Sequence, residues 1–124
     1  MNQSYGHPAK MANTNRLSFG AADGAQWRLE PQQRDLDANV IHLAAGSEIG
    51  EHEGPALDVL LHVFAGGGIL HTEADDIELE PGDIIYLPAG SRRRFVAGTQ
   101  GLAYFSVHQR KKTVGLMPTL RSQP

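Results

Sequence analysis

The chain has 124 residues, of which 40% are hydrophobic and 20% charged, the size and composition of one globular domain. Its formal net charge of −3 argues against general nucleic-acid binding, and no apolar run approaches the roughly 20 residues that span a bilayer. Cysteine is absent, which excludes disulfides and thiolate chemistry, and residues 1–8 lack the pattern of a signal peptide. We therefore expect a cytoplasmic protein.

Glycine and proline fall between short apolar runs along most of the chain, which is a β pattern. We expect a flexible N-terminal tail over 1–15, one barrel domain over 16–112 and a C-terminal tail over 113–124. Trp27 should lie on an edge strand. Further strands are expected at 40–45, 58–64, 69–72, 77–79, 83–87, 92–97 and 102–109, with glycine-rich breaks at 66–68 and 98–101. Because closure removes exposed edges, so many short strands favour a closed antiparallel barrel.

The charged residues are separated along the sequence. All 14 acidic residues lie at or before Asp83, and the seven basic residues after it are Arg92, Arg93, Arg94, Arg110, Lys111, Lys112 and Arg121. One interpretation is a basic patch that attracts an anionic ligand. The other is that acidic and basic strands lie side by side and neutralise each other across the sheet.

Two segments have a distinctive spacing of glycine, histidine and proline. In the first, Gly46 is followed by five residues and His52, and the following strand closes at Gly66. In the second, Gly82 is followed by five residues and then by the turn at 88–90. Together these segments, within residues 40–109, resemble the two motifs of the cupin superfamily. The resemblance implies an all-β, single-domain cupin with an antiparallel jelly-roll barrel, usually found as a homodimer.

The departures from those motifs bear on function. A metal-binding cupin places two histidines and a glutamate from the first motif, and one histidine from the second, inside its barrel. Here only His52 matches, because Gly54, Val59 and Arg93 stand at the other three positions. A guanidinium is a poor metal ligand, and a catalytic iron or zinc site usually needs three protein ligands. We therefore expect no metal cofactor. If one binds, His52 is its ligand, and the further candidates are His42, His62, His71, His108 and Glu48.

Arg93 is the most informative residue of the second motif. A cation inside a barrel is costly unless a partner neutralises it, and the planar fork of arginine suits a carboxylate, phosphate or sulfate. One hypothesis is that Arg93 and His52 hold an anionic or polar group in an otherwise apolar barrel. The other is an internal salt bridge, for which the candidate carboxylates are Glu48, Glu51 and Glu53. Arg92 and Arg94 should point to the opposite face of the strand.

Strand alternation supplies the remaining site candidates. Leu61 and Phe95 should face inward and form apolar wall, whereas the direction of Tyr86 and His108, which could also line the cavity, is not fixed by alternation. The ligand-binding set is thus His52, Arg93, Leu61, Phe95, Tyr86 and His108. The outward positions Leu60, His62 and Phe64 would suit a homodimer contact.

These observations favour a protein that binds a small polar or anionic molecule inside the barrel without a catalytic metal. Three alternatives stay open. The first is a metal-dependent dioxygenase, isomerase or epimerase with a rearranged ligand set around His52. The second is a metal-free enzyme in which His52 acts as general base. The third is a non-catalytic structural or regulatory oligomer with a filled barrel.

Overall fold

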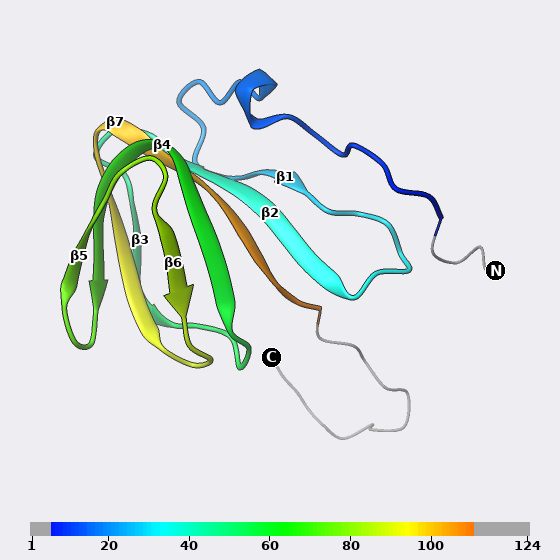
Figure 1. Cartoon of the computed structure of the whole chain (residues 1–124). Coiled ribbons are helices and arrows are strands. Elements are labelled where there is room, and N and C mark those ends of the chain that lie inside the picture. Colours follow the sequence, from blue (N-terminus) through cyan, green and yellow to red (C-terminus); the bar gives the residue numbers. More distant parts are fainter. Residues whose placement is uncertain (1–5, 111–124) are drawn as a thin grey trace.

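The structure, a computed structural model, describes residues 6–110 and is built almost entirely from antiparallel strands (Figure 1). One 3-10 turn, η2 (Thr14–Arg16), precedes the sheet. The strands are β1 (Gly24–Arg28), β2 (Leu36–Leu43), β3 (Glu48–Glu53), β4 (Val59–Thr72), β5 (Asp76–Leu79), β6 (Ile84–Leu87) and β7 (Arg92–Gln109). The chain is all-β, as the sequence predicts.

The two longest strands, β4 and β7, organise the fold. They pair with each other over most of their length, and each half of each strand has a different second neighbour. The first half of β4 pairs with β6 and the second half with β5. The second half of β7 pairs with β2 and the first half with β3. Because β4 and β7 bend over together (Figure 1), the sheet forms two layers, β1-β2-β7-β4-β6 and β3-β7-β4-β5. This is a jelly-roll arrangement.

The glycine-rich segments bend the strands and do not end them, which corrects the predicted breaks at 66–68 and 98–101. Gly66 has a φ of +69°, and a Cβ on it would lie 2.1 Å from the carbonyl oxygen of Gly101. Only a residue without a side chain lets the two backbones approach so closely. The strands predicted at 58–64 and 69–72 are therefore one continuous strand, β4, and those predicted at 92–97 and 102–109 are one continuous strand, β7.

The expectation of a closed barrel is also corrected. The strand order among the described residues has free ends, so hydrogen bonds do not close the barrel into a ring. The two layers enclose the core by facing each other. Strand β3, which the sequence did not indicate, is mostly exposed and polar. Its pairing with β7 defines it, so apolar periodicity could not reveal it.

The core lies between the layers and follows the expected alternation. In the first half of β4, Val59, Leu61 and Val63 are buried, whereas Leu60 and His62 are exposed. Leu70 from the second half of β4 has no exposed surface and packs in the same cluster. Burial of such a side chain stabilises the fold by about 1.5–3 kcal/mol.

The outer face of the first layer is partly covered by residues near the N-terminus. The Trp27 ring lies 6.5 Å from that of Phe105, which confirms the predicted edge strand against the barrel. The Phe19 ring stacks on His42 at 4.7 Å and lies 6.3 Å from Phe64. Phe64 is consequently half-buried and is not the free outward residue that the sequence suggested.

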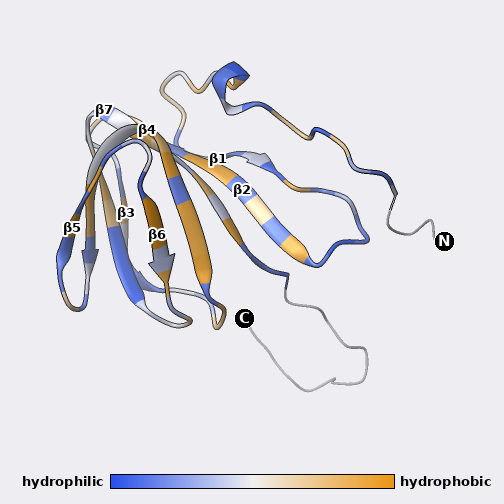
Figure 2. Ribbon diagram, viewed as in Figure 1, coloured by the Kyte–Doolittle hydropathy of each residue, from blue (hydrophilic) through white to orange (hydrophobic). Residues whose placement is uncertain are grey.

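The outer face of the second layer is polar, and Figure 2 shows the start of β7 in hydrophilic colours. Arg92 pairs with Glu51, and Arg94 pairs with Glu48, in both cases at 2.9 Å. Acidic and basic strands thus neutralise each other here, as the second interpretation of the charge pattern predicted. Lys111, Lys112 and Arg121 and the predicted tail at 113–124 lie outside the described residues. No helix within residues 6–110 is long and apolar enough to cross a membrane.

Candidate functional site

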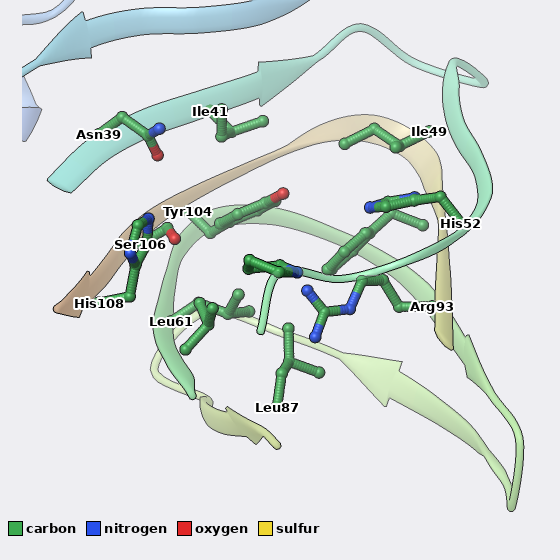
Figure 3. Close-up of a pocket in the computed structure, with 13 residues that line it drawn as sticks. Asn39, Ile41, Ile49, His52, Leu61, Leu87, Arg93, Tyr104, Ser106 and His108 are labelled. Carbon is green, nitrogen blue, oxygen red and sulfur yellow. The ribbon is translucent and has the colours of Figure 1, made fainter. Parts of the chain in front are cut away.

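A pocket of about 210 Å³ opens between the two layers (Figure 3). Its walls are mainly apolar and come from four strands of the first layer and two of the second. The apolar lining includes Ile41, Ile49, Val59, Leu61, Leu87 and Phe95. The barrel is therefore not packed solid at this end, which counts against the filled-barrel alternative.

Five of the six predicted site residues line this pocket, namely His52, Arg93, Leu61, Phe95 and His108. Tyr86 does not, which corrects the expectation that it could. Leu87 takes the inward position on β6, so the adjacent Tyr86 points outward and is 57% exposed. Its hydroxyl donates to the Asp58 carboxylate, which raises the pKa of Tyr86.

Arg93 is the buried charge of the pocket. It is 5% exposed, its Nη2 donates to the Ser91 hydroxyl at 2.8 Å, and its buried Nε has no hydrogen-bond partner among the described residues. Within residues 6–110 no carboxylate oxygen lies within 4.0 Å of its guanidinium. Burial lowers the pKa of Arg93 because the charged form loses its hydration.

Of the two hypotheses for Arg93, the internal salt bridge to Glu48, Glu51 or Glu53 is therefore wrong, and a bulge in β3 explains why. Ile49 pairs with Phe95, so a regular antiparallel ladder would place Glu51 opposite Arg93. A register shift between Ile49 and His52 instead places His52 there. Glu51 then reaches Arg92 on the outer face.

The second-layer backbone is shaped around the guanidinium. A Cβ on Gly54 would lie 2.2 Å from Nη1 of Arg93, so the guanidinium takes the space that a side chain at residue 54 would need. Arg93 thus occupies two of the four positions that hold metal ligands in the cupin motifs. Val59 is buried and apolar at the third position, which leaves only His52.

These residues do not fit a divalent metal. One imidazole beside a cation is not a ligand set, since a catalytic centre usually needs at least three donors. The rearranged set that the sequence left open is not assembled either. The part of the chain that the structure describes holds no group of three or more histidine, aspartate or glutamate side chains placed for a metal ion.

Sequence reasoning missed three polar lining residues, Asn39, Tyr104 and Ser106. The predicted strand began at residue 40, whereas β2 begins at Leu36, and alternation from Ile41 would have placed Asn39 inward. The Oδ1 atom of Asn39 is buried and has no hydrogen-bond partner in the part of the chain that the structure describes. The Tyr104 ring stacks on Phe95 with centroids 5.1 Å apart, and burial strongly raises the pKa of Tyr104, which keeps its hydroxyl neutral.

The two histidines are oriented by backbone carbonyls. His52 Nδ1 lies 2.9 Å from the carbonyl oxygen of Gly50, and His108 Nδ1 lies 2.9 Å from that of Gln109. Because a carbonyl oxygen can only accept, each Nδ1 carries a proton, and in the uncharged form of either ring Nε2 is the acceptor. His52 is exposed and stands at the rim, while His108 is half-buried.

The comparisons with solved structures point to one fold. A Cupin 2 conserved barrel domain protein from Salinispora arenicola is 21% identical, with a TM-score of 0.64 over 84% of this chain and 89% of that one. KdgF from Halomonas sp. is 20% identical, with a TM-score of 0.57 over 63% of this chain and 72% of that one. DMSP lyase DddQ from Ruegeria pomeroyi is 18% identical, with a TM-score of 0.58 over 64% of this chain.

This chain spans about two fifths of the length of the DMSP lyases, 41% and 38% in the two cases. No protein-family model matches the sequence, and no curated protein is significantly similar to it. Identities at this level establish the architecture and leave the chemistry to the site. The paired glycine-bent strands, the two-layer barrel and these neighbours agree that the chain has the fold of the cupin structures.

Proposed function

We propose that this protein binds a small organic anion in the pocket between the layers, with Arg93 as the anchoring residue and no metal involved. The supporting observation is the buried guanidinium, which has no carboxylate partner among residues 6–110. A buried, uncompensated charge costs several kcal/mol, so an anion placed against it would recover part of that cost. Arginine presents its donors in a planar fork, which favours a carboxylate or a similar oxyanion.

The size and walls of the pocket restrict the ligand. A volume of about 210 Å³ lies below the ~300–1,000 Å³ of pockets for drug-sized ligands, so the ligand is a small metabolite. Apolar side chains form most of the wall, which suits an apolar body behind the anionic group. Arg93 is the only lysine or arginine among the described residues that line it.

Calorimetric titration with a panel of small carboxylates tests this proposal. Arg93→Met should weaken binding by about 10- to 100-fold, because hydrogen bonds to charged groups contribute about 1.5–3 kcal/mol. Arg94→Met is the matched control, since Arg94 lies on the same strand, points outward and pairs with Glu48. Equal binding by wild type and Arg93→Met would refute the role of Arg93.

Gly54→Ala provides a second, gentler test. The added methyl group would displace the end of a flexible side chain and not the backbone, so we expect weaker anion binding with little loss of folding stability. If this variant binds carboxylates as wild type does, the position of the guanidinium is unimportant and the proposed geometry fails.

We also propose that the protein self-associates through the outer face of β4 and β6. Leu60 on β4 pairs with Tyr86 on β6, and His62 pairs with Ile84. Leu60, Tyr86 and Ile84 are 48%, 57% and 71% exposed, which is unusual for neighbouring apolar side chains on a monomer surface. Figure 2 shows β6 in hydrophobic colours. A second copy would cover this face.

A further inference from the structure

The polar groups of the pocket lie on two sides. Figure 3 shows Asn39, Ser106 and His108 on one side, and His52 and Arg93 on the other. The strand pairing agrees, because Asn39 is the cross-strand partner of Ser106, whereas His52 is the partner of Arg93. Leu61 and Tyr104 lie between the two sides in Figure 3, so the middle of the pocket is largely apolar.

The two sides differ in hydrogen-bonding character. The Arg93 side presents guanidinium donors, and the uncharged form of His52 adds an acceptor, Nε2, at the exposed rim. On the other side Asn39 Oδ1 is an acceptor without a partner among the described residues, and the uncharged form of His108, whose Nδ1 donates to the Gln109 carbonyl, presents Nε2 as an acceptor. The Ser106 hydroxyl can donate or accept. A buried acceptor left without a donor is unfavourable, so this side favours a ligand that brings a donor.

We infer that the ligand is a monocarboxylate with an apolar middle and a hydrogen-bond donor, a hydroxyl or amino group, at its far end. The inference rests on the proposed anion binding at Arg93 and adds the contact at Asn39. One arginine without a second cation suits a carboxylate monoanion better than a phosphate dianion. The donor would satisfy Asn39 Oδ1, with His108 and Ser106 alongside.

Two pairs of probes test the donor contact on the wild-type protein by calorimetry. The first pair is 4-hydroxybenzoate and benzoate, and the second is 5-hydroxypentanoate and pentanoate. The hydroxyl should tighten binding by about tenfold in at least one pair, the effect of one well-made hydrogen bond. 4-Methoxybenzoate, which can only accept at that position, should bind no more tightly than benzoate.

Asn39→Leu localises the effect, because leucine has a similar volume and no acceptor. In this variant the hydroxylated and plain acids should bind within about twofold of each other. Gln100→Leu, on the exposed bend of β7, is the control and should keep the preference. Thermal melting identifies a variant that does not fold. In that case the two probe pairs on the wild-type protein still test the donor contact.

The outcomes separate this inference from the proposed function. If the plain acids bind and the hydroxyl improves neither pair, the donor contact is refuted and anion binding at Arg93 stands. If phenyl phosphate binds more tightly than benzoate, the carboxylate assignment is refuted. If no carboxylate of the panel binds, the proposed function fails and the inference fails with it.

Discussion

Arg93 illustrates how one residue can serve binding at the expense of stability. Its charge is buried with no carboxylate partner in the described part of the chain, and its pKa is lowered by that burial. Binding sites often contain such locally unfavourable groups, because the ligand supplies the missing partner. The free protein should therefore be less stable than a variant with an apolar side chain of similar length.

Arg93→Met should raise the free energy of unfolding of the ligand-free protein by about 1–4 kcal/mol, because no ion pair is lost and a desolvated charge is removed. Urea denaturation followed by circular dichroism measures the change. Arg94→Met, the outward control, should change stability by less than about 1 kcal/mol, as expected for an exposed pair. A loss of stability in Arg93→Met would indicate that the guanidinium is neutralised in the fold.

The buried hydroxyl of Tyr104 should make the folding stability depend on pH in the alkaline range. Burial raises the pKa of its hydroxyl far above the ordinary value of about 10, so the unfolded chain releases this proton first. Between the two pKa values the unfolded state binds fewer protons, and stability falls as pH rises. Below about pH 9 both states are protonated and the contribution is constant.

Tyr104→Phe should flatten the decline in unfolding free energy between about pH 9.5 and 11. This range lies around and above the pKa of tyrosine in the unfolded chain and below the raised pKa in the folded protein. Denaturation curves at several pH values give the slope. Tyr86→Phe is the comparison, since Tyr86 is exposed and its raised pKa reflects a hydrogen bond to Asp58. We expect the smaller effect from that variant, and equal slopes for all three proteins would contradict the role of burial.

At the level of elements, the bend shared by β4 and β7 forms the two layers. It depends on glycine for a steric reason, because Gly66 faces the backbone of Gly101 and not a movable side chain. Gly66→Ala should cost at least about 1–3 kcal/mol from its left-handed backbone alone, with further cost from the contact. Thermal and urea unfolding measure the loss.

Gly50→Ala is the matched control for this bend. Gly50 also lies in a strand, does not have a positive φ, and a Cβ there would meet nothing within 4 Å. Its substitution should leave stability within about 0.5 kcal/mol of wild type. Equal losses in both variants would show that glycine entropy, and not the close approach at the bend, accounts for the effect.

The whole molecule has two dissimilar outer faces. The face of the second layer has ion pairs between β3 and β7, while the face of β4 and β6 exposes apolar side chains. Opposite charges that already neutralise one another give little drive to association, whereas exposed apolar area does. Self-association should therefore use the β4–β6 face.

Ile84→Glu should shift the protein from dimer to monomer in analytical ultracentrifugation, because a stable dimer buries about 800 Å² on each partner and a charge at its centre is unfavourable. Glu78→Gln on the charged layer should leave the association state unchanged. A wild-type protein that stays monomeric at high concentration would contradict the use of this face.

Much of the fold followed from local patterns. The alternation of Val59, Leu60, Leu61 and His62 identified the inward face of β4, because a half-buried strand has period two. The glycine positions correctly located the irregular segments of β4 and β7, but they were interpreted as strand ends and not as bends. A glycine that ends a strand and one that lets two strands approach closely look alike in sequence. Only the partner backbone at Gly101 distinguishes them.

Two facts about position 93 could be read from the sequence: a guanidinium and not an imidazole stands there, and strand alternation turns it inward. What that guanidinium meets depends on how the strands pair in three dimensions. A single extra residue in β3 changes the partner of Arg93 from Glu51 to His52, and Gly54 leaves the space that the guanidinium fills. Strand register depends on two segments that lie about 40 residues apart in the sequence, so no local pattern encodes it.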